Sequence, residues 1–333
     1  MAIYNRALSA QEAAQHYQMG MGQPFLLEPA PTTASVGVPL VLQPVGGVPP
    51  VTYSVLSGGG SISSLPTSIG VYTPSGPKGT DVVQATDANG NTATASIAVD
   101  YSPYSFPNLQ LLLDAKGITY QTGGSNVISW YDTSGWNRST MSSPGNYGVY
   151  QPLSINGFPA LNFPGASFYI INNFVFQGLF TGTNPITFVA LFQTTLPGVT
   201  QVLANIGDAV AADYHHALVL EAGNYRVRRS PAFVQGGALV DTNPHVVVTV
   251  FDGTQVSIYL DGLLTAGPFP VASSINIGGA QTRIGAETSF GPSSFTGDIG
   301  QIAIYNRSFT AVEANQLSCG LARMYSLVLP ACP

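Results

Sequence analysis

The chain has 333 residues, of which only 8% are charged, and its net charge is −6. The charged fraction is about a third of the value typical for globular proteins, whereas the apolar fraction is ordinary. Nucleic-acid binding is not expected, because it depends on many cationic contacts to phosphate. The length leaves room for two or three domains, and no apolar run reaches the roughly 20 residues that span a bilayer.

The first 20 residues predict a short strand over 2–8 and a helix after it. Ser9 and Glu12 have the spacing of a capping box, in which each side chain bonds the other's backbone amide. Residues 302–317 repeat the element, with a strand predicted over 302–309 and Thr310 and Glu313 in the capping positions. The residues that recur are Ala2, Ile3, Tyr4, Asn5, Arg6, Ala10, Glu12 and Ala13, which become Ala303, Ile304, Tyr305, Asn306, Arg307, Ala311, Glu313 and Ala314.

This repeat indicates a duplicated module. The second copy is expected to close a β-sandwich of this chain, but no such sandwich precedes residues 1–20. The first copy therefore predicts an assembly strand, made by Ala2, Ile3, Tyr4 and Leu8. It would dock on the sandwich of a neighbouring copy or belong to a domain further upstream in a longer tandem chain. Docking on its own C-terminal domain is the third alternative, although the second copy already occupies that position.

Residues 21–101 contain short apolar-alternating runs, namely VPLVLQPV, VTYSVLS, VYTPSG, DVVQATD and TATASIAVD. Gly and Pro clusters separate them, which is typical of a small β-sandwich. The ending ATDANGNTATASIAV resembles the last hairpin of bacterial immunoglobulin-like (Ig-like) repeat domains. The cysteine pair and buried tryptophan of antibody domains are missing, so the resemblance concerns the architecture.

Residues 102–333 contain longer strands, in the segments LLLDAKGIT, NVISWYDTSGWNRST, QPLSINGFPALNFPG, VSIYLDGLLTAG and TRIGAETSFGPSSFTGDIGQIAIYNRSFTAVEANQL. In combination they resemble a laminin-G-like, concanavalin A-like jelly roll, and residues 1–20 resemble the remnant of a second such domain. The expected fold class is all-β: a strand-helix segment over 1–20, an Ig-like sandwich over 21–101 and a jelly roll with a C-terminal tail over 102–333.

Three local signals belong to the last region. Asp261-Gly262 predicts a type I′ hairpin turn. Residues 297–300 predict a turn into the closing strand, whose Ile302 and Ile304 should face inward. Asp132 and Ser134, between Trp130 and Trp136, are expected to bond local backbone amides.

The sequence indicates a protein without catalytic activity. Retaining glycosidases of the concanavalin A-like fold carry an E-x-D-x-x-E strand with two carboxyl groups about 5–5.5 Å apart, and this chain has no such strand. Of its glutamates, Glu12 and Glu313 are assigned to helix caps. The remaining Glu28, Glu221 and Glu287 are not within strand-pair spacing of one another.

No metal or cofactor is required by any motif. His215-His216 would point to opposite faces of a strand and are expected on a surface loop. Asp208 and Asp213 are weak candidates for a Ca²⁺ site on a sandwich rim, as some relatives of this fold have, because the spacing of a dedicated calcium loop is absent.

The cysteines Cys319 and Cys332 predict one disulfide that holds the C-terminal tail, with two free thiols as the alternative. Asn137 and Asn306 match the N-glycosylation sequon. Asn137 is expected on a loop, whereas Asn306 belongs to the repeated element, whose other copy has Ala7 in place of the sequon serine. Aromatic side chains at loop tips often contact carbohydrate, and the candidates are Trp136, Tyr147, Tyr150 and Tyr214.

Together these patterns predict an extracellular or cell-surface structural protein. Its copies would assemble head to tail into a fibre of alternating Ig-like and laminin-G-like modules, with carbohydrate either bound or covalently attached. The alternative function is a lectin-like adhesion protein or an accessory module of a secreted hydrolase. Neither a nucleic acid nor a membrane span is expected.

Overall fold

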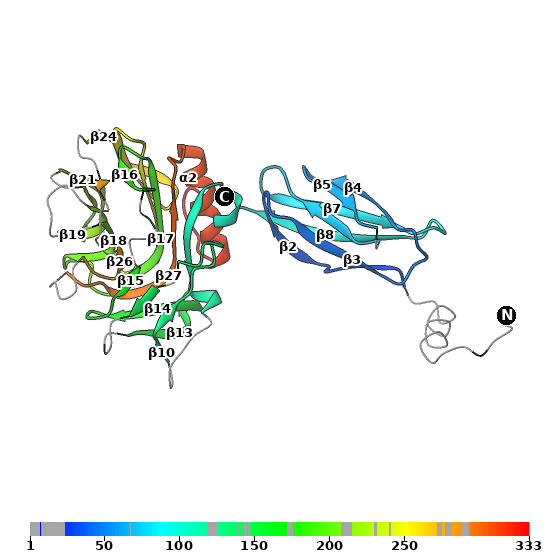
Figure 1. Cartoon of the computed structure of the whole chain (residues 1–333), viewed down its shortest axis with the longest axis horizontal. Helices are drawn as coiled ribbons and strands as arrows, with labels where there is room; N and C mark the ends of the chain where they lie inside the picture. The colour runs from blue at the N-terminus through cyan, green and yellow to red at the C-terminus, as the bar shows by residue number, and fades with distance from the viewer. Residues whose placement is uncertain are drawn as a thin grey trace. The chain divides into compact units, whose positions relative to one another are not determined.

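The computed structural model describes residues 7, 24–66, 68–118, 125–138, 140–142, 145, 147–171, 176, 178–207, 215–229, 232–239, 241–271, 275–276, 282–287 and 293–332. The chain divides into two compact units, Met1–Ser105 and Phe106–Pro333 (Figure 1). The predicted strand and helix over 1–20, with the assembly residues Ala2, Ile3, Tyr4 and Leu8, lie outside the described residues.

The first unit contains two four-stranded sheets around one core. One sheet has the order β1 (Leu26–Glu28), β3 (Leu40–Val45), β6 (Gly70–Thr73) and β5 (Ser61–Ser64). The other has the order β2 (Thr32–Ser35), β8 (Thr92–Asp100), β7 (Gly79–Thr86) and β4 (Thr52–Ser57), followed by the 3-10 helix η1 (Pro103–Ser105). β2 pairs with β8 in parallel, and the other neighbours are antiparallel.

The burial of β8 shows how the sequence builds this unit. Along β8 the side chains alternate between buried and exposed, because successive residues of a strand point to opposite faces. Ile97 and Val99 from this sheet pack with Leu42 and Tyr72 from the other sheet in a single core. The predicted sandwich is present, with β1, β2 and β5 as strands that the sequence did not predict. Its Ig-like relationship stays a prediction.

The second unit is a larger sandwich, in which the first sheet has nine strands. Eight of them run in the order β10 (Asn126–Val127), β13 (Gly148–Ile155), β14 (Phe158–Pro164), β27 (Thr296–Tyr305), β17 (Ile186–Thr194), β22 (His245–Phe251), β23 (Gln255–Leu260) and β24 (Leu263–Pro270). The ninth, β9 (Leu109–Asp114), also pairs with β27. The 3-10 helix η2 (Ala115–Gly117) follows β9.

The second sheet of this unit has eight strands. They run in the order β11 (Ser129–Trp130), β12 (Thr140–Ser142), β15 (Tyr169–Ile171), β26 (Thr282–Ile284), β18 (Gln201–Gly207), β19 (His215–Glu221), β20 (Asn224–Arg229) and β21 (Ala232–Leu239). A two-stranded ribbon, β16 (Thr181–Gly182) with β25 (Ile275–Asn276), completes the described strands. The all-β fold class is thereby confirmed.

The two sheets enclose one apolar core. Its members alternate with residues on the opposite faces of the strands, and they include Trp130, Leu161, Phe163, Phe188, Phe192, Leu218, Tyr225, Val247, Ile284, Ile302 and Ile304. The inward orientation predicted for Ile302 and Ile304 is confirmed. Burial on this scale, at about 25 cal/mol per Å² of apolar surface, supplies the main drive for folding of the unit.

The closing strand β27 is central in its sheet rather than terminal. β17 pairs along one side, and β14 and β9 share the other. The turn predicted over 297–300 is wrong, because these residues belong to β27. Gly297, with a φ of +146°, pairs with Thr194 of β17. A bulge between Leu191 and Phe192 leaves Gly300 without a partner on β17, and the pairing continues on both sides of it.

The C-terminal helix α2 (Ala311–Met324) has the predicted capping box. The Thr310 hydroxyl accepts from the Glu313 amide, and the Glu313 carboxylate accepts from the Thr310 amide. The strand predicted over 302–309 ends earlier, at Tyr305. Phe309 instead packs against the rings of Tyr305 and Phe106, at centroid distances of 4.7 and 4.9 Å. The helix packs on β22, on the face of the nine-stranded sheet that points away from the core (Figure 1).

Candidate functional site

An exposed tryptophan lies on the loop between β11 and β12. Trp136 keeps 57% of its surface exposed, which is unusual for so large an apolar side chain. Its indole Nε1–H donates a hydrogen bond of 2.9 Å to the carbonyl of Leu109. The ring is therefore fixed at its polar end and open to solvent elsewhere.

Arg138 supports this ring from within the protein. Its guanidinium carbon lies 4.9 Å from the centre of the Trp136 ring and 5.0 Å from that of Phe176, so the cation contacts two aromatic rings. The same group is buried and donates from Nη1 to the carbonyl and side-chain oxygens of Gln110, at 2.7 and 2.8 Å. These contacts keep the Trp136 ring in one orientation.

Asp132 fixes the loop that carries Trp136. One carboxylate oxygen accepts from the amides of Leu112 and Ser134, and the other accepts from the Arg138 amide and the Ser134 hydroxyl. The predicted bonds between this loop and its local amides are confirmed. The loop is thus organised before any ligand arrives, which lowers the entropy lost on binding.

The name Trp136 platform is used below for Trp136 with its supports Arg138, Asp132 and Gln110. A flat aromatic face of this kind can pack against the apolar C–H face of a sugar ring, which provides apolar contact while the sugar hydroxyls stay hydrated. Asn137, the next residue in the chain, is also exposed and carries a polar amide.

The other aromatic candidates lie elsewhere. Tyr150, on β13, is partly buried against the core of the sandwich. Tyr147 is half-buried before β13, and its carbonyl accepts from the Ser167 hydroxyl. Tyr214 lies outside the described residues. Of the four candidates, Trp136 is therefore the one for which the structure shows a large exposed ring.

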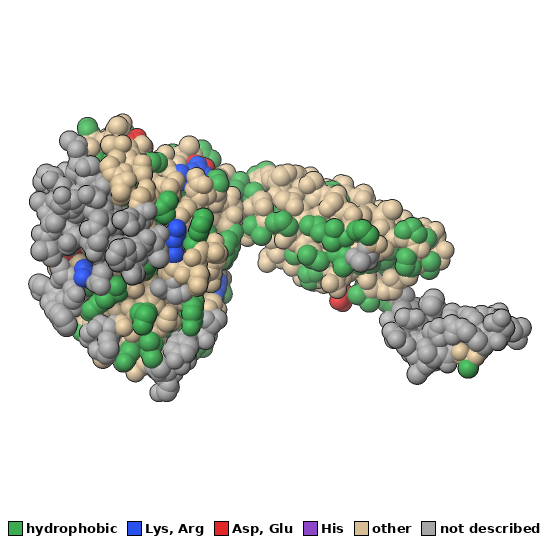
Figure 2. All heavy atoms as spheres, viewed as in Figure 1, with side chains coloured by type: hydrophobic (Ala, Val, Ile, Leu, Met, Phe, Trp, Pro, Cys, Tyr) green, Lys and Arg blue, Asp and Glu red, His purple; other side chains and the backbone are tan. Residues whose placement is uncertain are grey.

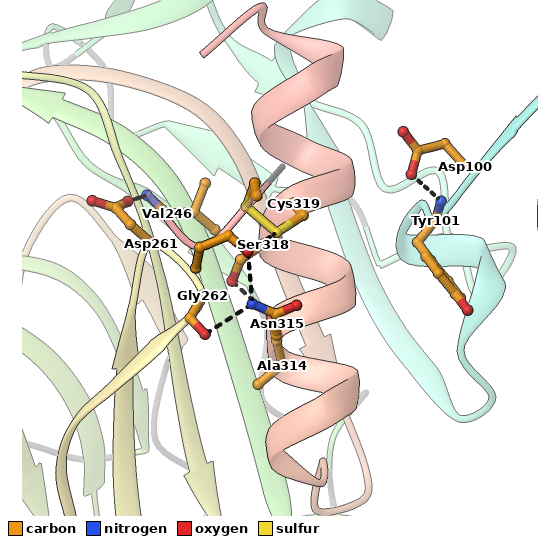
Figure 3. The surroundings of a disulfide bond; sticks show 11 residues. Asp100, Tyr101, Val246, Asp261, Gly262, Ala314, Asn315, Ser318 and Cys319 are labelled. Atoms are coloured by element: carbon orange, nitrogen blue, oxygen red, sulfur yellow. Dashed lines mark hydrogen bonds between the residues drawn. A yellow bond between two sulfur atoms is a disulfide. The ribbon is translucent and has the colours of Figure 1, made fainter. Parts of the chain in front are cut away.

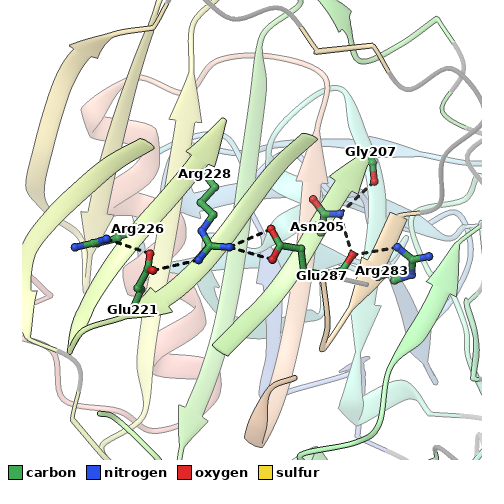
Figure 4. Close-up of polar contacts among 7 residues, drawn as sticks. All are labelled: Asn205, Gly207, Glu221, Arg226, Arg228, Arg283 and Glu287. Carbon is green, nitrogen blue, oxygen red and sulfur yellow. Dashed lines mark hydrogen bonds and ion pairs between the residues drawn. The ribbon is translucent and has the colours of Figure 1, made fainter. Parts of the chain in front are cut away.

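A second polar cluster lies on the face of the eight-stranded sheet that points away from the core. Arg228, on β20, bonds both carboxylate oxygens of Glu287 at 3.0 and 3.2 Å and one oxygen of Glu221 at 3.2 Å. Arg226 bonds the other oxygen of Glu221 at 3.1 Å (Figure 4). The carbonyl of Glu287 accepts from Arg283 and from the amide of Asn205.

These residues are called the Arg–Glu row below, and sequence reasoning did not predict them. The sequence places Glu221 and Glu287 outside strand-pair spacing of each other, and in the structure both carboxylates bond the guanidinium of Arg228. The register of the strands explains how the row forms across the sheet. Arg283 pairs with Asn205, Asn205 with Ala217, and Ala217 with Arg228. Paired residues of neighbouring strands share a face, so these four line up across the sheet.

His245 forms a third cluster, at the start of β22. Its Nδ1 lies 2.7 Å from Asp261 and its Nε2 lies 3.0 Å from Asp241. Burial lowers the pKa of His245, but the hydrogen bonds and negative charges of Asp261 and Asp241 outweigh it, so the pKa is raised overall. Tyr225 packs edge-on against the imidazole, and burial together with the two carboxylates raises the pKa of its phenol.

Asp261 also belongs to the predicted hairpin turn, which is confirmed. Asp261 and Gly262 have φ values of +52° and +84°, and Leu260 pairs with Leu263 across the turn. The carbonyl of Gly262 accepts from Asn315 of α2 (Figure 3). Asn315 also donates to the carbonyl of Ala331, so this turn is tied to the helix and to the C-terminal tail.

The tail is held by a disulfide between Cys319 and Cys332, whose Cα atoms are 5.2 Å apart (Figure 3). Cys319 is buried on α2, and Cys332 lies 13 residues later. Such bonds persist in oxidising compartments.

The sequon asparagines differ in their surroundings. Asn137 is exposed beside Trp136 with a φ of +56°, so a glycan could be attached to it without unfolding the loop. Asn306 is partly buried directly after β27, where its backbone amide donates to the carbonyl of Asn108.

The metal candidates receive no support from the described residues. Asp208 and Asp213 lie outside them, and the part of the chain that is described holds no group of three or more His, Cys, Asp or Glu side chains that could bind a metal ion. The prediction of loop histidines is wrong, because His215 and His216 both belong to β19. His216 is buried, with Nε2 3.5 Å from the Thr249 hydroxyl. Alternation on a strand turns it toward the core.

The surface agrees with the composition. On the face shown in Figure 2, charged side chains are sparse among hydrophobic and uncharged ones, especially over residues 24–105. Within the described ranges, no helix combines the length and apolar character needed to cross a membrane.

Comparison with known protein families gives a match within the second unit. Residues 178–315 match the family model described as the concanavalin A-like lectin/glucanases superfamily. The match agrees with the laminin-G-like resemblance of the sequence. No curated protein sequence matches the chain.

Solved structures show distant likeness. A Trypanosoma rangeli sialidase with 2,3-difluorosialic acid is 20% identical over 66% of this chain and 33% of its own, with a TM-score of 0.47. Domain 4 of AbnA, an arabinanase from Geobacillus stearothermophilus in complex with arabinotriose, is 15% identical over 63% of this chain and 98% of its own, with a TM-score of 0.46. The binding domain of Paraclostridial Mosquitocidal Protein 1 is 13% identical over 64% of this chain and 52% of its own, with a TM-score of 0.47. The chain spans about a third of the length of the sialidase.

Proposed function

We propose that the second unit is a non-catalytic carbohydrate-binding module of an extracellular protein, and that the Trp136 platform is its contact site. The observation that carries the proposal is a 57% exposed tryptophan held in place by a buried arginine. Exposing this ring costs free energy, because its apolar surface stays in contact with water. A ligand that covers the ring recovers that free energy, and the concanavalin A-like family of residues 178–315 favours a carbohydrate as that ligand.

The arrangement of carboxylates supports a binding role over hydrolysis. In glycosidases the acid and its partner carboxylate flank the scissile bond and leave room for it. Glu221 and Glu287 are the two glutamates that come together, and the guanidinium of Arg228 bonds both of them. Both carboxylates are thus engaged with one guanidinium, which favours a binding role.

A glycan array probed with the full chain tests the proposal. We expect binding to a defined set of glycans, and loss of that signal for Trp136→Ala. Phe269→Ala is the matched control, because Phe269 is also an exposed aromatic residue, 47% exposed on β24. Equal signals from the wild type and Trp136→Ala, or no glycan binding by the wild type, would reject the assignment.

A second function, assembly through residues 1–17, has an observation of its own. The residues shared by the two copies have defined roles in the second one: Arg307 forms an ion pair with Glu313, Glu313 completes the helix cap, and Ile304 is buried in the core. Their counterparts Arg6, Glu12 and Ile3 are suited to the same roles in a sandwich other than residues 106–332, and we infer that a neighbouring copy provides it.

Light scattering of the full chain tests this assembly. Ile3→Asp and Tyr4→Asp should each shift large assemblies toward monomers, whereas Ala7→Ser, at a position where the two copies differ, should not. A monomeric wild type would contradict the assembly and leave carbohydrate binding untouched.

A further inference from the structure

We infer that the Arg–Glu row on the eight-stranded sheet is a second ligand site, which binds neighbouring hydroxyl groups of an uncharged saccharide. The inference deepens the proposed carbohydrate function and rests on it. The site is separate from the Trp136 platform, because its residues come from β18, β19, β20 and β26 together with Glu287, whereas the platform lies on the loop between β11 and β12.

The side chains of the row point away from the core. Leu218 and Val227 alternate with Ala217 and Arg228 and belong to the core between the sheets, so Ala217 and Arg228 lie on the opposite face. Arg226, Arg228, Glu221 and Glu287 keep 17–28% of their side chains exposed. Their polar ends are therefore within reach of a ligand in solution.

The row offers donors and acceptors side by side. Arg228 joins two carboxylates, and Glu221 joins two guanidinium groups, so N–H groups and carboxylate oxygens alternate along it (Figure 4). A carboxylate oxygen has two lone-pair sites and an arginine has five N–H donors, so ion pairing does not exhaust either group. A pair of adjacent hydroxyls suits such a surface, because each hydroxyl can donate to a carboxylate and accept from a guanidinium.

The charge of the row favours an uncharged ligand. Arg228 already lies against two carboxylates, so an anionic sugar that approached it would also meet the negative charges of Glu221 and Glu287. Neutral hydroxyls encounter no such repulsion. Beside the row, Val202, Ala217 and Val219 form a small, fully buried apolar cluster on the same face, which supports the row from below.

Asn205 provides an independent indication of a ligand. It is fully buried, and its amide nitrogen donates to the carbonyls of Gly207 and Glu287. Its amide oxygen accepts no hydrogen bond from the described residues. In Figure 4 this oxygen is turned away from the two carbonyls that the nitrogen bonds. A buried acceptor without a donor is costly, and a ligand hydroxyl or a water molecule would satisfy it.

Titration calorimetry of the full chain with neutral and acidic oligosaccharides tests the site. The neutral panel contains gluco-, galacto- and manno-oligosaccharides, and the acidic panel contains oligogalacturonate and oligosialate. We expect a neutral ligand whose affinity falls at least tenfold in Glu287→Gln and in Arg228→Met but changes less than twofold in 0.5 M NaCl. Screening by salt would weaken an ionic contact much more.

The variants separate this site from the Trp136 platform. Glu287→Gln keeps the shape of the side chain, and an unchanged melting temperature will show that it folds. If both row variants bind like the wild type while Trp136→Ala does not, the row is overturned and the proposed function stands. Preference for the acidic panel, with binding lost in 0.5 M NaCl, would overturn the uncharged ligand. If the wild type binds neither panel, the proposed function fails together with the inference.

Discussion

The guanidinium of Arg138 lies over the ring of Trp136, 4.9 Å from its centre, so the exposed tryptophan contacts a buried cation. Replacing Arg138 by alanine leaves the side-chain oxygen of Gln110 without its donor and removes the support beneath Trp136. An unsatisfied buried polar group costs about 1–3 kcal/mol. We expect Arg138→Ala to lower the free energy of unfolding by about that amount.

Two measurements check this expectation. Denaturant unfolding gives the loss of stability. The fluorescence anisotropy of the tryptophans reports the added motion of the Trp136 ring, and the Trp136→Phe variant shows how much of that signal comes from Trp136. Arg138→Lys keeps the charge but lacks the planar group that packs against the two rings, so it should restore only part of the stability. Wild-type stability and anisotropy in Arg138→Ala would show that the cation does not hold the ring.

The raised pKa of His245 makes stability depend on pH. The protonated imidazole bonds Asp261 and Asp241, so its stabilising effect is fully present below the unfolded pKa, which is about 6.5. The effect is lost as pH rises through the raised folded value. Stability should therefore be higher at pH 6 than at pH 9, as urea unfolding at both values can show.

His245→Gln is the control, because it cannot gain the charge. This variant should lose the difference between pH 6 and pH 9. Burial raises the pKa of Asp241, but the hydrogen bonds from Asn243 and His245 outweigh it, so the pKa is lowered overall. The stabilising effect of Asp241 is therefore lost only as pH falls through that lowered value. Equal pH slopes in the wild type and His245→Gln would contradict the role given to His245.

The disulfide should contribute measurably to stability. It closes a loop across 13 residues, for which chain entropy gives about 3 kcal/mol. For a unit of this size each kcal/mol corresponds to roughly 2–4 °C in melting temperature. The double variant Cys319→Ser with Cys332→Ser should melt about 6–12 °C below the wild type in calorimetry.

Reduction supplies the matching control for the disulfide. Dithiothreitol should lower the melting temperature of the wild type to that of the double serine variant and leave the variant unchanged. A wild type that melts at the same temperature with and without reductant would show that the tail contributes little.

Gly297 marks a close approach of two strands. A Cβ atom added there would lie 2.2 Å from the carbonyl oxygen of Gln193 on β17, and the residue also has a positive φ. Gly157 has a positive φ as well, but an added Cβ meets nothing within 4 Å. Gly297→Ala should therefore destabilise the unit by several kcal/mol, whereas Gly157→Ala should cost about 1 kcal/mol from backbone strain alone. Chemical denaturation of the two variants gives the comparison, and equal losses would contradict the crowding at β27.

Period-two alternation and turn residues predicted most of the strands, because both signals are local in the sequence. The turn at Asp261-Gly262 and the cap at Thr310 were predictable for the same reason. The Arg–Glu row was not, since Glu221 and Glu287 meet only through the pairing of β18 with both β19 and β26. Trp136 was predicted as a contact residue from its type, but its support by Arg138 depends on packing against β9 and Phe176.

The same limit explains the errors. Residues 297–300 have the composition of a turn, yet they join a central strand because β17 and β14 pair with them on both sides. Burial of His216 likewise follows from its neighbours in the sheet rather than from the flanking sequence. Long-range pairing thus determines which polar residues become structural and which face a ligand.

Calorimetric titration of one array-selected glycan into three proteins tests the central claim most directly: the wild type, Trp136→Ala and Phe269→Ala. Stacking on an aromatic ring together with its buried area amounts to about 1.5 kcal/mol or more, which is at least tenfold in Kd. We predict that Trp136→Ala weakens binding at least tenfold while Phe269→Ala binds like the wild type. An unchanged Kd for Trp136→Ala would contradict the assignment of the Trp136 platform as the carbohydrate site.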